Sequence, residues 1–263
     1  MKDAVDAQLR DQQAGFRKDR LCTDQIATLW TIVGQSTEWN LSLYINFIDY
    51  EKAFDSVDRR TLWKLLRHYR VPEKIVNTIR NSYDELQCKV VHGGQLTDAF
   101  QVRTGVRHSC LLSHFLFLLV VDWIMKTSTS EGKHGIQWTA QNQLDDLDFA
   151  DDLALLSHTH EQMQIKTASV AAVSASVGLS IHKKKTKVPK FKADSNPITF
   201  DGETLEDVES FTYLGSITDE QGGSDADVKA RIGKARTTQD TQHPLAGYHQ
   251  QQPFVGENKP VSR

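Results

Sequence analysis

Apolar and polar positions follow two different periods along this chain, and together they predict strands interleaved with helices. A nearly continuous apolar run over residues 43–48 ends at Asp49, a pattern typical of a strand that is buried on both faces. Two further apolar runs of strand length flank Asp151 and Asp152. They predict a tight hairpin with buried arms and a charged turn.

Helical periodicity and turn signals account for most of the remaining chain. Helices are predicted within residues 1–35 around a charged loop at 16–20, from Asp58 to before Pro72, from Pro72 to Leu86, and at 111–126, 161–177 and 228–235. Hairpins are predicted at 89–103 and 198–217, and a short strand at 179–181. Gly178 is expected in the C′ position that ends the preceding helix. Helices that alternate irregularly with hairpins predict an α+β domain built on an antiparallel sheet.

Composition narrows the class of protein without deciding its function. The 263 residues carry a net charge of −3, so any nucleic-acid binding must come from local basic patches and not from the global field. Three widely spaced cysteines argue against a disulfide framework or a zinc cluster. Residues 1–20 lack the apolar core of a secretory signal, and the apolar stretch 111–125 is too short and too polar to span a bilayer. We therefore expect an intracellular protein, nuclear or cytoplasmic, that is neither secreted nor bound to a membrane, with no protein partner evident.

The acidic turn is the strongest candidate for chemistry. An Asp-Asp pair alone is common in turns, because aspartate accepts hydrogen bonds from nearby backbone N–H groups. Asp49, at the end of a predicted buried strand, supplies a third carboxylate, and adjacent strands would bring it to the same end of the sheet as Asp151 and Asp152. Such a cluster favours Mg²⁺, and two such ions can clamp both oxygens of an in-line phosphoryl displacement. No glycine-rich phosphate loop is present, so a nucleotide would be held by metal and side chains.

Six sequence blocks, in order, resemble the reverse transcriptases of non-LTR retrotransposons. The segments 45–57 and Phe149-Ala150-Asp151-Asp152 resemble the first and third palm motifs of this family. The other matching blocks are 13–17 with 22–26 (a fingers motif), 104–117 (the second palm motif), 178–187 (the fourth) and 211–215 (the primer grip).

The resemblance implies a fold and a division of the chain. The expected fold is a polymerase-like fingers and palm, with an antiparallel palm sheet flanked by helices. Residues 1–42 would be partial fingers, 43–218 the palm with inserted fingers elements and the primer grip, and 219–236 the start of a thumb helix. Residues 237–263 have no apolar period and predict a disordered tail.

The resemblance also assigns roles to individual residues. Asp49, Asp151 and Asp152 would hold two Mg²⁺ ions, with Mn²⁺ as an alternative, and Lys185 would protonate the leaving pyrophosphate. Phe54 would exclude the ribose 2′-OH, although its spacing alone would suggest a core aromatic side chain, and Lys185 alone would suggest a solvated basic face. Nucleotide contacts are expected from Phe54, Arg17, Tyr50, Arg107 and His108. Primer or template contacts are expected from Tyr213, Leu214, Gly215, Lys183, Lys184 and Lys187.

The implied reaction is RNA-directed DNA synthesis, with an RNA template, a DNA primer and deoxynucleoside triphosphates as partners. The chain departs from the family pattern at several positions: the family has Gln and Gly where this chain has His108 and Ser109, Pro in place of His114, Asn in place of His182 and Gly in place of Asp19. The altered second palm motif and the short thumb leave a noncatalytic nucleic-acid-binding remnant, or a relic without function, as the alternative. A third hypothesis is an unrelated two-metal phosphohydrolase.

Overall fold

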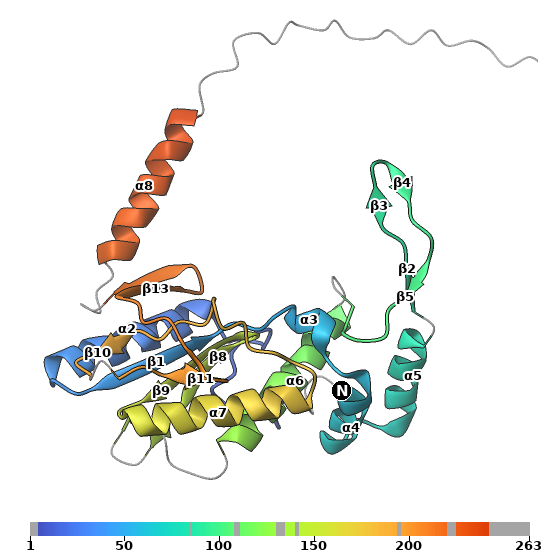
Figure 1. Ribbon diagram of the computed structural model, residues 1–263, viewed down its shortest axis with the longest axis horizontal. Helices are drawn as coiled ribbons and strands as arrows, with labels where there is room; N and C mark the ends of the chain where they lie inside the picture. Colours follow the sequence, from blue (N-terminus) through green and yellow to red (C-terminus); the bar gives the residue numbers. More distant parts are fainter. Residues whose placement is uncertain are drawn as a thin grey trace, which may run out of the picture.

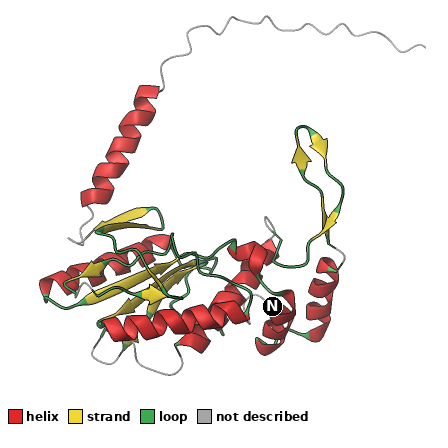
Figure 2. Ribbon diagram, viewed as in Figure 1, coloured by secondary structure: helices red, strands yellow, loops and turns green. Residues whose placement is uncertain are grey.

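The computed structural model describes residues 5–84, 86–107, 111–129, 135–139, 142–193, 196–219 and 225–241. A central sheet lies between helices, and a long hairpin and a C-terminal helix extend from opposite ends of this body (Figure 1). The predicted α+β class is confirmed, since helices and antiparallel strands alternate along the chain (Figure 2). No helix within the described residues is both long and apolar enough to cross a membrane.

The central sheet brings together strands that are far apart in the sequence. Its order is β10 (Lys190–Phe191), β1 (Leu43–Ile48), β9 (Asp152–Ser157) and β8 (Asp146–Phe149), and every pair is antiparallel. The predicted strand 43–48 is confirmed and is buried along its whole length. The pairing of Ile48 with Leu153 fixes the register of β1 against β9. It places the end of β1 beside the turn between β8 and β9.

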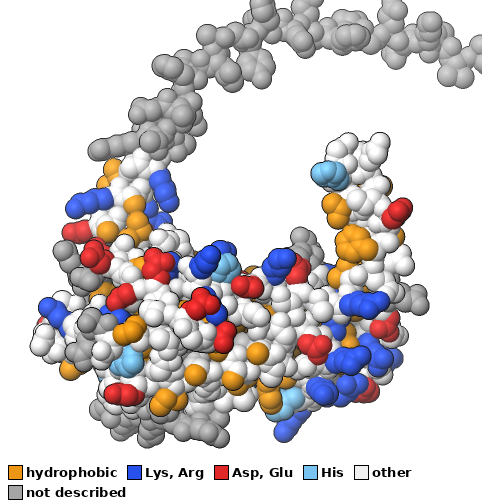
Figure 3. All heavy atoms as spheres, in the orientation of Figure 1, with side chains coloured by type: hydrophobic (Ala, Val, Ile, Leu, Met, Phe, Trp, Pro, Cys, Tyr) orange, Lys and Arg blue, Asp and Glu red, His pale blue; other side chains and the backbone are white. Residues whose placement is uncertain are grey.

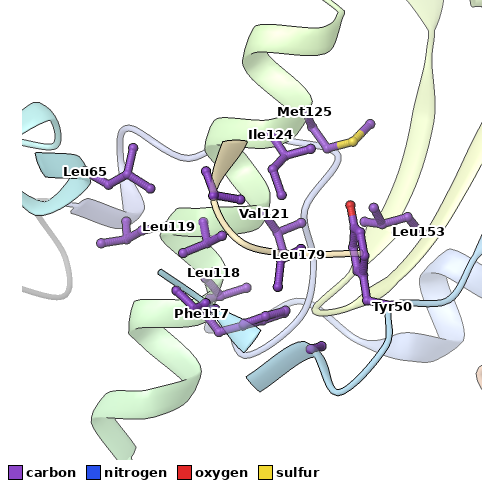
Figure 4. Close-up of a cluster of buried hydrophobic side chains, with 14 of the residues drawn as sticks. Tyr50, Leu65, Phe117, Leu118, Leu119, Val121, Ile124, Met125, Leu153 and Leu179 are labelled. Atoms are coloured by element: carbon purple, nitrogen blue, oxygen red, sulfur yellow. The ribbon is translucent and has the colours of Figure 1, made fainter. Parts of the chain in front are cut away.

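Alternate side chains of the sheet enter two separate apolar clusters. Leu43, Ile45 and Phe47 of β1 pack with Leu29 and Val33 of helix α2 (Cys22–Glu38). On the opposite face, Tyr44 and Ile48 of β1 join a larger cluster with helices α6 (Leu111–Ser128) and α7 (His160–Ser176). Part of this larger cluster, including Phe117, Val121 and Leu153, is drawn in Figure 4. The period-2 pattern of the strands therefore separates two helical layers.

The first part of the chain after β1 forms a helical unit that carries a projecting hairpin. Its helices are α3 (Ala53–Ser56), α4 (Arg59–His68) and α5 (Glu73–Tyr83). Asp58 caps α4 as predicted, because its side chain accepts a hydrogen bond from the Thr61 amide. Beyond α5, strand β2 (Gln87–Cys88) pairs with β5 (Phe100–Gln101), and β3 (Val91–His92) pairs with β4 (Gln95–Leu96). The predicted hairpin is thus present, with Gly93 and Gly94 at its tip.

The C-terminal part of the described chain consists of short hairpins and one helix. Strand β11 (Thr199–Phe200) pairs with β12 (Glu203–Thr204), and β13 (Ser210–Tyr213) pairs with β14 (Ser216–Asp219). Strand β6 (Ile136–Gln137) pairs with β7 (Gln143–Leu144) earlier in the chain. Helix α8 (Asp225–Thr241) follows the last hairpin.

Several predicted boundaries are wrong. Residues 7–15 form turns and irregular backbone, not a helix, because this segment runs beside β8 and bonds to its backbone, whereas the loop predicted at 16–20 is present. The region 198–217 is two hairpins and not one, since Phe200 pairs with Glu203 and Tyr213 with Ser216. Residues 179–181 contribute only an isolated bridge, between Ile181 and Tyr50. Helix α8 continues to Thr241, five residues past Arg236, and 242–263 lie outside the described residues.

Candidate functional site

Three aspartates, Asp49, Asp151 and Asp152, lie at the same end of the central strands. Asp49 directly follows β1, and the β8–β9 hairpin closes with Phe149 paired to Asp152, so that Ala150 and Asp151 form its turn. Continuing the register of Ile48 with Leu153 by one step sets Asp49 opposite Asp152. Residues about a hundred positions apart thus lie at the same end of the sheet, as the sequence predicted.

The electrostatics of these side chains show that their negative charges are poorly compensated. Partial burial raises the pKa of Asp151 above its usual value, and the nearby Asp49 raises it further. Partial burial, then Asp151 and then Asp49, raises the pKa of Asp152 to about 6. The charge of Asp49 therefore makes the ionised forms of both turn carboxyls less favourable, and Asp151 adds to this effect on Asp152. A cation placed among them would relieve this repulsion.

Among the described residues, Lys185 is the cationic side chain closest to these carboxylates. Its Nζ lies 3.9 Å from Asp49 Oδ1, and its side chain is largely exposed. The backbone of the same loop holds Asp49, because His182 N–H donates to the Asp49 carbonyl at 2.7 Å. A single lysine at this distance leaves three carboxylates only partly balanced.

A small cavity of about 50 Å³ links these carboxylates to the β13–β14 hairpin. Asp49, Asp152 and Lys185 line it together with Phe211 and Thr212. Phe211 stacks on Phe47 with ring centroids 3.9 Å apart, which anchors the hairpin to the sheet. The turn of this hairpin, Leu214-Gly215, has φ of 49° and 78°, the geometry of a tight two-residue turn. The segment that resembles a primer grip is thus next to the carboxylates.

The acidic turn itself is braced by a segment from the N-terminus. Ala150 has φ of 60°, a conformation that costs a non-glycine residue free energy. The fully buried Gln13 accepts a hydrogen bond from the Ala150 amide at 3.0 Å and another from the Gly15 amide at 2.8 Å. Gly15 packs so closely that an added Cβ would lie 2.3 Å from Ala150 N. The chain therefore holds a strained turn in place from outside the hairpin.

Beneath the turn lies a buried ionic network that sequence analysis missed. Arg10 donates to both oxygens of Asp146, at 2.8 and 2.9 Å, and to Asp148. Asp122 joins the network through the Arg10 amide and through Tyr69 and Lys126. Burial raises the pKa of Asp148 well above its usual value, Asp146 raises it further, and Arg10 opposes the shift. The sequence signal for this network is the presence of Asp146 and Asp148 in an otherwise apolar strand. Buried carboxylates require a compensating buried cation.

Aromatic side chains surround Phe54, which the sequence predicts to contact the nucleotide. Phe54 stacks on Phe117 with centroids 4.4 Å apart, and His114 lies edge-on to it at 5.9 Å. His114 also contacts the ring of the exposed Phe16, at 4.2 Å. Gly105 has φ of 75°, and a Cβ there would lie 2.6 Å from Phe54 O, so only glycine allows this approach.

Some residues expected at the nucleotide or primer instead make internal contacts. Arg17, with a side chain only 8% exposed, pairs with Asp6 at 2.9 Å and donates to the carbonyls of Arg10 and Gln13. Tyr50 points into the core, where its hydroxyl bonds Ser174 Oγ at 2.8 Å (Figure 4). Tyr213 is 2% exposed, and its hydroxyl donates to the Leu147 carbonyl. These internal contacts stabilise the fold, and direct substrate contacts from the three residues stay a prediction.

The lysine run is largely neutralised by its own chain. Lys183 pairs with Asp201 and Glu203 at 3.0 and 2.7 Å, and Lys187 pairs with Glu206. Lys184 is exposed and has no ion-pair partner among the described residues. Lys184 and Lys185 are thus the members of this run with charge available to a ligand.

The remaining predicted positions divide between exposed and undescribed ones. Arg107 is exposed, with its guanidinium 5.8 Å from the Tyr83 ring centroid. His108 and Ser109 lie outside the described residues. Asp19 has φ of 58°, in the left-handed region of backbone conformation. Glycine, the family's residue at this position, adopts this region without strain, and aspartate adopts it more readily than most other residues.

The donor set suits a hard cation, although the described residues contain no preassembled cage. Within them, no three His, Cys, Asp or Glu side chains are grouped closely enough to hold a metal ion. Carboxylate oxygens are nevertheless the ligands that Mg²⁺ prefers, and it takes only one or two of them together with substrate phosphates. The raised pKa values of Asp151 and Asp152 are the observation that fits this chemistry.

Comparison with known protein families identifies the family to which this chain is similar. Residues 1–218 match the reverse transcriptase (RNA-dependent DNA polymerase) family. A Pol polyprotein from the type-2 retrotransposable element R2DM of Drosophila melanogaster is 28% identical over 174 residues, which are 66% of this chain and 16% of that protein. A Pol polyprotein from the type-1 element R2 of Nasonia vitripennis is 29% identical over 197 residues, 68% of this chain and 18% of that protein.

Solved structures support the same fold at low sequence identity. Apo telomerase from Candida tropicalis, truncated from its C-terminal domain, matches with a TM-score of 0.60 and 15% identity, covering 84% of this chain and 43% of that one. Telomerase from the same organism in complex with a fragment of telomeric RNA matches with a TM-score of 0.58 and 13% identity, covering 86% and 36%. The chain therefore spans less than half of each of these relatives.

Proposed function

Because the chain belongs to the reverse transcriptase (RNA-dependent DNA polymerase) family, we propose that its acidic turn is a nucleotidyl-transfer site. In this reaction a primer 3′-OH attacks the α-phosphorus of a deoxynucleoside triphosphate, paired to an RNA template, and pyrophosphate leaves. The observation that carries the proposal is the convergence of Asp49, Asp151 and Asp152, whose charges raise the pKa values of the turn carboxyls.

The three carboxylates would hold the metal ions, with Asp49 and Asp151 as the most direct ligands. Bound Mg²⁺, or Mn²⁺ in its place, would supply charge that stabilises the attacking and leaving oxygens. Lys185, whose Nζ lies 3.9 Å from Asp49 Oδ1, would give a proton to the departing pyrophosphate. Its exposure keeps the side chain free to follow a substrate.

Aromatic contacts support a role for Phe54 in selecting the sugar. The ring belongs to α3 and is held in place by stacking on Phe117 and by the edge of His114. A rigid ring at this position would exclude a nucleotide that carries a 2′-OH, which is the group that distinguishes ribonucleotides. The β13–β14 turn, at Leu214 and Gly215, would contact the primer end across the small cavity.

Primer extension on an RNA template tests the proposal. We expect Asp151→Asn to lower the rate of Mg²⁺-dependent extension by about 100-fold or more, since removing a metal ligand removes charge stabilisation of the transition state. Asp98→Asn, an exposed aspartate of the projecting hairpin, removes the same charge elsewhere and should leave extension unchanged. Equal extension by the parent chain and Asp151→Asn would refute the assignment.

A second candidate function is noncatalytic binding of nucleic acid. It is favoured by the lack of a grouped three-ligand metal site among the described residues, and by the internal contacts made by Arg17 and Tyr213. Under this alternative, a primer-template would bind in a salt-dependent way while extension stays at background with and without Mg²⁺.

A further inference from the structure

A basic cavity lies on the helical unit, away from the acidic turn in the fold. It has a volume of about 460 Å³ and is enclosed by α4, the end of α5 and the segment that follows β5. Six basic side chains line it: Arg59, Arg60, Lys64, Arg67, Arg80 and Arg103. Asp84 is the acidic residue of this lining. Figure 3 shows Lys and Arg side chains gathered at this end of the molecule.

Most of these basic side chains form no ion pair within the described part of the protein. Arg60, Lys64, Arg80 and Arg103 are exposed and have no ion-pair partner among the residues that the structure describes. Arg67 pairs with Glu73 at 2.7 Å, and both side chains stay about half exposed. Like charges held together in one concavity repel each other, so an anion that entered it would relieve this repulsion.

Aromatic side chains form part of the same wall. Trp63 is half-buried and meets the ring of the buried Tyr83 edge-on, with centroids 5.7 Å apart. The Arg59 guanidinium lies 4.9 Å from the centre of the Tyr83 ring. Of the two rings, Trp63 is the one that is partly exposed. A basic groove with a partly exposed aromatic ring is a combination that binds single strands, because phosphates contact the cations while a base stacks on the ring.

One loop joins the cavity to the proposed reaction site. Arg59 donates to the carbonyls of Val102, Thr104 and Gly105, at 2.7 to 2.8 Å, and so fixes residues 102–105 against α4. The next residue, Val106, donates its amide to the Phe54 carbonyl at 2.7 Å. The cavity and the Phe54 segment are therefore on two sides of the same loop.

We propose that this cavity binds the sugar-phosphate backbone of a single-stranded nucleic acid, as a second contact for the strand that the polymerase site copies. The inference rests on the proposed function for the identity of the strand, while the cavity, its unpaired charges and its aromatic wall carry the binding itself. With a net charge of −3 on the whole chain, such a strand needs a local basic site of this kind.

Salt-dependent binding tests the proposal without any catalysis. Fluorescence anisotropy of a labelled single-stranded oligouridine RNA of about 16 nucleotides, with oligothymidine DNA in a parallel arm, would be measured from about 50 to 200 mM salt. We expect Arg60→Gln/Lys64→Gln to reduce the slope of log affinity against log salt by about 1.4, because each lost phosphate contact removes about 0.7. The two cations stand four residues apart on α4, so neutralising them relieves repulsion and leaves the helix intact.

Lys74→Gln/Lys229→Gln is the matched control, since both lysines are exposed and neither lines the cavity. The control should keep the parent slope. An unchanged slope in Arg60→Gln/Lys64→Gln, an equal loss in both double variants, or no binding by the parent would each overturn the proposal. The proposed function is tested separately, by primer extension with Asp151→Asn. Binding of RNA but not DNA, or the reverse, would assign the type of strand.

Discussion

At the scale of single residues, the acidic turn combines charge repulsion with backbone strain. Asp151 and Asp152 have raised pKa values because they are partly desolvated and face other carboxylates. Ala150 occupies a left-handed conformation that glycine would adopt at lower cost. Both features lower the stability of the metal-free protein, which is common where function requires a fixed arrangement of groups.

Asp152→Asn is expected to stabilise the metal-free protein at neutral pH. The folded pKa of about 6 lies above the ordinary value of 3.8, so the ionised carboxyl disfavours folding above pH 6, and this penalty disappears as the pH falls below about 4. After allowance for solvent screening, we expect a gain of about 1 kcal/mol in the free energy of unfolding.

Urea denaturation at pH 7.5 and pH 4, with a chelator present, measures this effect. The difference between Asp152→Asn and the parent should be present at the higher pH and vanish at the lower one. Added Mg²⁺ should stabilise the parent more than the variant, because the ion binds the carboxylates. A variant that is less stable than the parent at neutral pH without metal would contradict the electrostatic argument.

Two glycines give a matched pair of tests for the close packing at the turn. Gly15→Ala would push a Cβ to 2.3 Å from Ala150 N, so we expect a loss of about 1–3 kcal/mol in stability. Gly34→Ala, within α2, meets no atom within 4 Å and should gain up to about 1 kcal/mol from helix propensity. Thermal or chemical unfolding of both variants checks this, and equal effects would show that residue 15 does not press on the turn.

At the scale of elements, the β8–β9 hairpin depends on a segment more than a hundred residues earlier. Residues 12–14 exchange backbone hydrogen bonds with Asp148, and Gln13 holds the Ala150 amide. Arg10 compensates the two aspartates that β8 carries into the interior. The hairpin therefore has a local sequence signal for its turn but no local means of holding its charges.

Removal of Arg10 should destabilise this element strongly. Arg10→Gln leaves Asp146 and Asp148 without their buried cation, and breaking such a pair costs about 3–5 kcal/mol. Chemical denaturation at neutral pH measures the loss. In the same background, Asp146→Asn/Asp148→Asn should restore part of it, because the uncompensated charges are then gone.

The exposed pair of Arg20 with Asp11 supplies the control for this prediction. Its atoms are 3.3 Å apart, and both side chains are open to solvent, at 43% and 91% exposure. We expect Arg20→Gln to change stability by less than about 0.5 kcal/mol. Similar losses for Arg10→Gln and Arg20→Gln would mean that burial of the network adds nothing to its strength.

At the scale of the whole molecule, the sheet divides the interior into two layers and the surface charge is unevenly distributed. The cluster with α2 and the cluster with α6 and α7 take alternate side chains of the same strands. Although the net charge of the chain is −3, basic side chains gather over α4 and α5 (Figure 3), while Asp49, Asp151 and Asp152 lie at one end of the central strands. Local fields, and not the total charge, decide where an anion or a cation can bind.

The sequence by itself determined the elements whose signals are local. The buried strand before Asp49, the hairpin at Asp151, the Asp58 cap and the Gly178 terminus were all predicted correctly, because periodicity, capping and turn chemistry act over a few residues. The order of the motif blocks also identified the family, and with it the residues to examine at the site.

Only the tertiary structure decided which side chains point inward and which charges remain free. Arg17, Tyr50 and Tyr213 belong to family motifs, yet they pair or pack inside the protein. Sequence could not show that Lys183 is neutralised while Arg60 is not, since each outcome depends on a partner brought near by folding. Burial and charge compensation are properties of contacts between distant segments, and one-dimensional patterns do not contain those contacts.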